Sequence, residues 1–162
     1  MKKLDCNEYY VCRLQAKVFE ASLTKSNTSS PVFIRRFMNS NIARAFDNKT
    51  IMMSPLDINN ILDIIDEEYG TSSYGKVKYD NNEIYWIGYF YRVLSFYLDI
   101  SSKTIYKIFP LKEIKSYYYI GHTFDPEKAA ENIIESKHLN EDLTAKGVEI
   151  LKRLTLEAEQ NR

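Results

Sequence analysis

The residue types that most often carry catalysis are scarce in this 162-residue chain. It has two histidines, His122 and His138, and two cysteines, Cys6 and Cys12. Nucleophilic catalysis needs a Ser or Cys beside a base that a third group orients. Of the two histidines, His122 is the better candidate base, because Asp125 follows three residues later and could hold its ring. A hydrogen-bonded structural histidine is the favoured interpretation, and a general acid or base is the alternative.

Metal and cofactor chemistry is not indicated either. Zinc sites take four ligands, mainly Cys and His, at short regular spacings, and calcium loops need closely spaced acidic residues. Cys6 and Cys12 stand six positions apart, and we expect them to be reduced thiols on the first helix. The prediction is therefore a protein without metal or cofactor, and not an enzyme.

Arg92 is the one central charge in a strongly apolar segment, residues 84–98. A guanidinium buried there must find a carboxylate or several carbonyl groups, because isolation would cost several kcal/mol. We expect a structural pair between Arg92 and an acid such as Asp63 or Glu67, rather than a catalytic role.

The segment from Leu94 to Ile108 resembles a helix-turn-helix, the DNA-reading unit of many bacterial regulators. Ser95 is small where the second helix passes the first, and Asp99 replaces the usual turn glycine. The residues expected to face phosphates and bases are Ser101, Ser102, Lys103, Thr104 and Lys107. The apolar first helix and the net charge of zero argue against DNA contact.

The elements that position these residues are predicted to be helices. Apolar residues recur at spacings of three and four, and no alternation long enough for a confident strand occurs. Start signals stand at Ser30-Pro31, at Ser54 with Asp57 as a capping box, and at Asn140. The stripe from Phe33 to Phe46 indicates one continuous second helix.

Length and composition limit the fold to one domain. The chain is 44% hydrophobic and 27% charged, which is typical of a globular protein with a single core. We predict an all-α bundle of about six to seven helices with a helix-turn-helix-like segment. Residues 1–30 would form an N-terminal helix and linker, 31–137 the helical core, and 138–162 a C-terminal amphipathic helix.

Charge is unevenly distributed along the chain. Residues 1–49 carry nine Lys or Arg and four Asp or Glu, whereas residues 50–100 carry three and eight. Such blocks can pair within one fold or face separate partners. No apolar run approaches the roughly 20 residues of a membrane span, and polar residues follow the start too soon for a signal peptide. We expect a cytoplasmic protein without a membrane partner.

Four segments carry a broader resemblance to a known family: Phe37–Ser40, Tyr85–Arg92, Ser101–Lys107 and His122–Pro126 with the Ala-rich helix that follows. Together they make residues 35–135 similar to a family of small antitoxin-like proteins of Firmicutes, often encoded first in a two-gene toxin–antitoxin pair. The resemblance implies a protein partner, a co-encoded toxin, and assigns no role to individual residues.

Three functions follow, in order of preference. The first is an antitoxin-like protein that covers its toxin with a helical surface, with residues 1–30 and 138–162 as the expected contact segments. The second is a regulator that binds operator DNA through Ser101–Lys107, which is compatible with the first. The third is a small enzyme that uses His122.

Overall fold

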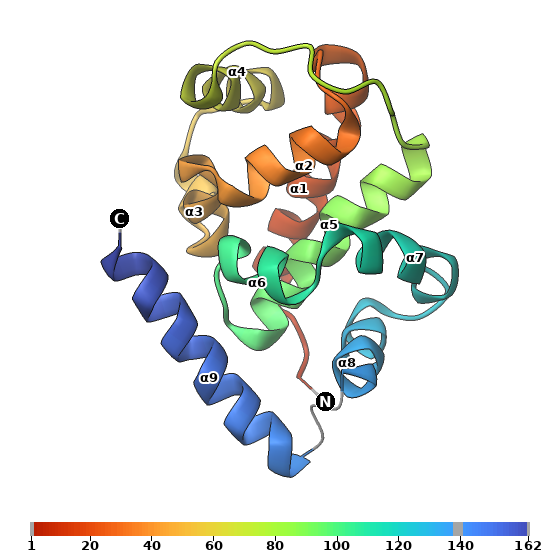
Figure 1. The fold of residues 1–162 in the computed structure, drawn as a ribbon, viewed down its shortest axis with the longest axis vertical. Helices are drawn as coiled ribbons and strands as arrows, with labels where there is room; N and C mark the ends of the chain where they lie inside the picture. The colour runs from red at the N-terminus through yellow and green to blue at the C-terminus, as the bar shows by residue number, and fades with distance from the viewer. Residues whose placement is uncertain (1, 138–140, 162) are drawn as a thin grey trace.

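The computed structural model describes residues 2–137 and 141–161, which form nine α-helices and one short 3-10 helix (Figure 1). The elements are α1 (Cys6–Lys25), α2 (Ser30–Asn39), α3 (Asn41–Asp47), η1 (Thr50–Met53), α4 (Ile58–Tyr69), α5 (Asn81–Leu98), α6 (Ser102–Ile108), α7 (Leu111–Gly121), α8 (Pro126–Ser136) and α9 (Glu141–Gln160). The described residues contain no strand, so the predicted all-α class is confirmed.

The centre of the bundle is the pair α1 and α5. Helix α5 is apolar on nearly every side, and such a helix is stable only when other helices surround it. Gly88 allows the close approach: a Cβ there would stand 2.7 Å from the Phe19 ring. The amide of Gln15, on α1, donates to the Gly88 carbonyl at 3.0 Å, which further ties the two helices together.

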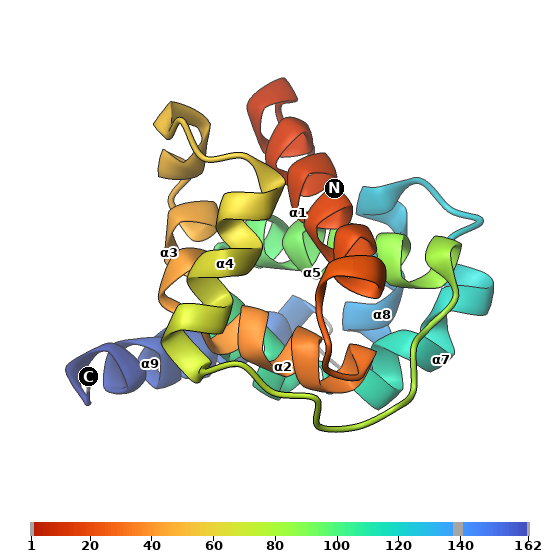
Figure 2. The ribbon, with the colours of Figure 1, turned by 90° about the horizontal axis from the view of Figure 1, so that it is seen from above.

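Helices α2, α3 and α4 cover one side of this pair. Edge-to-face aromatic contacts hold α2 and α3 there, with ring centroids 5.1 Å apart for Phe19 and Phe37 and 5.3 Å apart for Phe37 and Phe46. Helix α4 instead buries aliphatic side chains: Ile61, Leu62 and Ile65. Residues 70–80 then run as an extended segment from α4 past α2 to α5 (Figure 2). Backbone hydrogen bonds from Ser29 and Ser30 to carbonyls of this segment attach it to the start of α2.

Helices α7 and α8 cover the other side of α5, and an aromatic cluster joins them to it. Trp86 stacks on Phe90 with centroids 4.5 Å apart. Tyr117 of α7 packs beside both rings and donates its hydroxyl to the Ala129 carbonyl of α8 at 2.9 Å. The aromatic richness of the sequence is therefore used mainly for packing.

Two predicted boundaries are wrong for the same reason, local capping. Ser40 splits the expected second helix, because its hydroxyl accepts from the Ala43 N–H and donates to the Phe37 carbonyl. The capping box of the next helix is formed by Asp57 and Asn60, not by Ser54 and Asp57. With Pro110 separating α6 from α7, the helices outnumber the six to seven predicted. The expected cap at residue 140 lies outside the described residues.

Within the described ranges, no helix combines the length and the apolar character that crossing a membrane would require.

Candidate functional site

Arg92 is the centre of a buried polar network between α1, α3, α5 and α6. Its side chain is fully buried, and four hydrogen bonds satisfy it. Its Nε donates to Gln15 Oε1 at 2.8 Å, its Nη1 to Asp47 Oδ1 at 2.6 Å and Ser95 Oγ at 3.2 Å, and its Nη2 to Ser102 Oγ at 2.5 Å. A buried guanidinium with this many partners holds four helices in one arrangement.

The acid that pairs with Arg92 is Asp47, not Asp63 or Glu67. Asp47 ends α3, and its carboxylate also accepts from the backbone N–H of Ser102 at 3.0 Å and from the Ser102 hydroxyl at 2.6 Å. Asp63 lies on α4, the next α-helix along the chain after α3, and its side chain is exposed to solvent. Sequence separation hides this pair, because Asp47 and Arg92 lie 45 positions apart.

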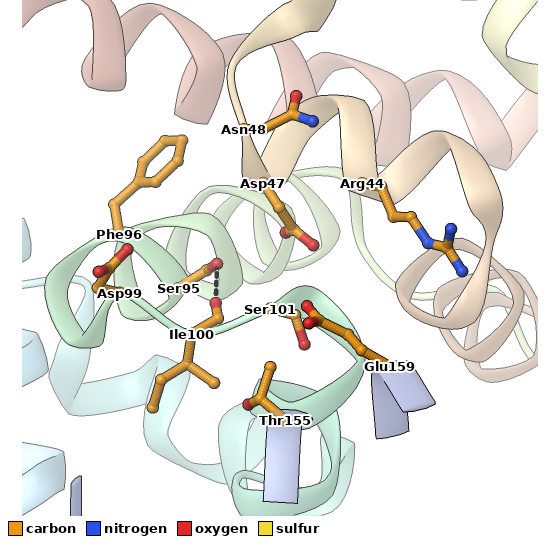
Figure 3. A pocket seen from close by; sticks show the side chains of 10 residues that line it. All are labelled: Arg44, Asp47, Asn48, Ser95, Phe96, Asp99, Ile100, Ser101, Thr155 and Glu159. Carbon is orange, nitrogen blue, oxygen red and sulfur yellow. Dashed lines mark hydrogen bonds between the residues drawn. The ribbon is translucent and has the colours of Figure 1, made fainter. Parts of the chain in front are cut away.

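A pocket of about 310 Å³ opens beside this network, between α3, the turn from α5 to α6, and α9 (Figure 3). Its lining is mixed polar and charged: Arg44, Asp47, Asn48, Ser95, Phe96, Asp99, Ile100, Ser101, Thr155 and Glu159. No histidine or cysteine is among the described residues that line it. Asp47 and Ser95 are already bonded to Arg92, so the described lining offers groups for recognition and shows no nucleophile beside a base.

The turn from α5 to α6 includes the residues that suggested DNA binding. Asp99 is left-handed at φ 55° and ψ 52°, the conformation that a short helix–turn–helix connection uses. Ser101 caps α6 by accepting from the Thr104 N–H.

A DNA-reading helix is nevertheless not shown. Helix α6 has seven residues, Ser102 and Thr104 are buried, and Lys103 is half-buried. Ser102 points into the Arg92 network and Thr104 toward α9, so of the five candidate residues Lys107 alone is exposed. The sequence pattern could not reveal the cover over Thr104, because Thr155 of α9 lies 51 positions further along the chain.

Helix α9 lies beside α6 (Figure 1). The Thr155 hydroxyl meets that of Thr104 at 3.1 Å, and Leu151 is buried at 8% exposure. Further pockets of about 200 and 280 Å³ flank the helix on its α6 side and along Lys152 and Leu156. Among residues 148–161, whose side chains the structure describes, three aliphatic side chains are exposed: Ile150 at 47%, Leu154 at 48% and Leu156 at 57%.

His122 and Asp125 lie on the opposite side of the molecule, in the turn between α7 and α8 (Figures 1 and 2). The His122 ring stacks on Tyr118 at 4.6 Å, and its Nδ1 lies 2.6 Å from the Tyr118 carbonyl. Asp125 is the N-cap residue of α8, and no bond joins it to His122 within the described residues. The structure does not bring these two side chains together as an acid–base pair.

Among the described residues, the cysteines and the acidic side chains do not form a second catalytic or metal-binding site. Cys6 is exposed and Cys12 is buried, and neither is in a disulfide. Burial raises the pKa of the Cys12 thiol to about 12, so it stays protonated near neutral pH. In the part of the chain that the structure describes, no three His, Cys, Asp or Glu side chains are grouped as metal ligands would be.

One expected contact segment is not free. Helix α1, within residues 1–30, buries its apolar face along α5, because that apolar helix requires a neighbour. Its start is also fixed, since Glu127 of α8 accepts from the Leu4 N–H at 3.3 Å and from the Tyr9 hydroxyl. In the two terminal segments, the large hydrophobic side chains that are exposed among the described residues are Tyr10 of α1 and Ile150, Leu154 and Leu156 of α9, so aliphatic exposure is concentrated on α9.

Known proteins do not extend these observations, because comparisons of the chain with family models, curated proteins and solved structures give no match.

Proposed function

We propose that this chain is an antitoxin-like interaction protein of the cytoplasm, which binds and neutralises a co-encoded toxin through the surface formed by α9 and the pockets beside it. The observation that carries the proposal is the exposure of Ile150 and Leu154, which lie one turn apart on the same side of a terminal helix. Leu156 is exposed on another side of this helix. Amphipathic helices dock into grooves of other proteins, and neighbouring exposed apolar side chains mark interaction surfaces.

The absence of a nucleophile–base arrangement in the main pocket also favours binding over catalysis. Two of its polar side chains, Asp47 and Ser95, accept hydrogen bonds from Arg92, and the others come from separate elements. A protein that neutralises by covering needs a large complementary surface and no reacting group of its own.

The test is co-expression with the product of the adjacent gene. We expect that protein alone to arrest growth, and this chain to restore growth and to copurify with it. The variant Ile150→Lys/Leu154→Lys should weaken the complex at least tenfold, because two charges would be placed in an apolar contact. Tyr119→Lys/Val77→Lys is the matched control, since both residues are more exposed and lie away from α9. No copurification and no rescue by the unmodified chain would refute the proposal.

A DNA-binding regulator is a second candidate, favoured by the left-handed turn at Asp99 and by exposed Lys107. A mobility-shift assay on the DNA upstream of the gene tests it. Binding should weaken with added salt and with Lys103→Glu or Lys107→Glu, because phosphate contacts release counterions. A shift that neither variant changes would exclude α6 as the contact.

A further inference from the structure

We propose that the seat of α9, formed by α6, the end of α3 and the α5–α6 turn, is a helix-binding groove, and that an acidic amphipathic helix of the partner protein displaces α9 from it. This inference rests on the proposed function and names the kind of segment that the site recognises. Helix α9 is then the internal occupant of this groove, and once released it presents Ile150 and Leu154 to the same partner, so the contact of the proposed function is kept.

The first argument is packing. Of the α9 residues whose side chains the structure describes, 148–160, Leu151 is the one that joins the hydrophobic core, at 8% exposure. Pockets of about 310, 200 and 280 Å³ lie along this part of the α9 contact. Side chains that line a pocket lack partner atoms on one side, so this part of α9 loses few contacts when it leaves.

The second argument is charge. Lys107 of α6 and Glu157 of α9 line the same pocket, and Arg44 of α3 and Glu159 of α9 line another. Among the described residues, neither Lys107 nor Arg44 forms an ion pair. From Leu154 to Asn161 the chain carries these two acids and no Lys or Arg. Asp47 and Asp99 also line the pocket of Arg44, but Asp47 is paired with Arg92, so Arg44 and Lys107 outnumber the remaining acid of the groove. The groove therefore keeps an excess of positive charge and favours a helix with carboxylates in its last turns.

The third argument is the character of the contact itself. At its middle, the hydroxyls of Thr104 and Thr155 meet at 3.1 Å. A small hydroxyl residue lets the two helices approach, and Leu151 lies one turn before it on the same face. An incoming helix thus needs an aliphatic residue, a small residue four positions later and acids beyond it.

The first experiment uses a labelled synthetic peptide of residues 141–161 as the probe. Full-length Leu151→Asp should vacate the groove, and the peptide should bind this variant at least tenfold more tightly than the unmodified protein, whose own α9 competes. A peptide with Leu151→Asp is the control and should not bind either protein. Equal affinity for both proteins, or equal binding of the control peptide, would overturn the proposal.

The second experiment locks the helix in place without weakening the fold. Thr104→Cys/Thr155→Cys, in a Cys6→Ser background, should form a disulfide across the 3.1 Å hydroxyl contact. The oxidised protein should lose binding of the 141–161 peptide, and a reducing agent should restore it. Peptide binding that does not depend on oxidation would contradict a shared groove.

The locked variant also separates this inference from the proposed function. With the adjacent gene product as partner, the reduced form should copurify and the oxidised form should bind at least tenfold more weakly. Complex formation by both forms would keep the interaction protein and reject helix exchange. If a second copy of the chain were the occupant, the unmodified protein would form dimers on size-exclusion chromatography, and a monomer is the result expected.

Discussion

Arg92 illustrates how a single buried charge can set the arrangement of a helical bundle. Four of its N–H groups reach side chains on α1, α3, α5 and α6, so the guanidinium is satisfied only when all four helices are in place. The aromatic rings of Phe46 and Phe96 lie 5.7 and 5.3 Å from its Cζ and add cation–π contacts. Because burying a charge is costly, we expect the hydrogen bonds of Arg92 to favour one arrangement of the four helices over others more than they raise the free energy of unfolding.

Removal of Asp47 should therefore be costly. Asp47→Ala leaves Arg92 buried without its counter-charge, and we expect a loss of about 3 kcal/mol in the free energy of unfolding, the lower end for a broken buried pair because Asp47 is partly exposed. Asp63→Asn, on the exposed side of α4, should change it by less than about 0.5 kcal/mol. Urea unfolding followed by the fluorescence of Trp86 measures both. Equal small effects would show that the pair is not needed.

Glu127 should make stability depend on pH. Burial alone would raise the pKa of Glu127, but hydrogen bonds from Tyr9 and from the Leu4 backbone outweigh it and lower the pKa below its ordinary value of 4.5. A lowered folded pKa means that the carboxylate stabilises the fold above about pH 4.5 and that this contribution disappears as pH falls through the folded value. In urea unfolding, Glu127→Gln should thus lower the free energy of unfolding at pH 7, and the difference from the unmodified protein should shrink as the pH falls well below 4.5 and the carboxylate becomes protonated. A pH-independent difference would contradict this.

At the scale of elements, the contact between α1 and α5 depends on the missing side chain of Gly88. Glycine is a poor helix former, so replacement by Ala would normally stabilise a helix by up to about 1 kcal/mol. Here the closeness of Phe19 reverses that preference.

Gly88→Ala should destabilise the protein by about 1–3 kcal/mol, because the new Cβ would stand 2.7 Å from the Phe19 ring and both helices would have to shift. Asn82→Ala, exposed near the start of the same helix, is the matched control and should be neutral or slightly stabilising. Thermal unfolding by circular dichroism compares them. A Gly88→Ala protein as stable as the control would mean that the helices pack less closely.

At the scale of the whole molecule, the helices are not equally tightly packed. Among the described residues, the hydrophobic core is concentrated along α1, α2 and α5, whereas α9 contacts mainly α6. Local opening costs least where few apolar contacts must be broken.

Hydrogen exchange measured by mass spectrometry should reveal this order. Backbone amides of α5 should exchange most slowly, those of α1 nearly as slowly, and those of residues 148–160 in α9 faster by at least tenfold. The oxidised Thr104→Cys/Thr155→Cys protein should slow the α9 amides specifically. Protection of α9 equal to that of α5 in the unmodified protein would argue against a displaceable helix.

The sequence by itself determined the all-α class, the start of a helix at Ser30-Pro31, and the burial of Arg92 within the apolar segment 84–98. These properties depend on local preferences: apolar spacing of three and four, serine and aspartate caps, and proline at helix starts. The break at Ser40 was also local, although the apolar stripe from Phe33 to Phe46 concealed it.

Tertiary structure alone decided which distant groups meet. It paired Arg92 with Asp47, turned Ser102 inward, and placed α9 over Thr104. The physical reason is that such contacts depend on the angles and distances between packed helices, which no short stretch of chain encodes. For the same reason the main pocket, whose lining comes from α3, α5, α9 and the α5–α6 turn, could not be predicted from residue types and spacing.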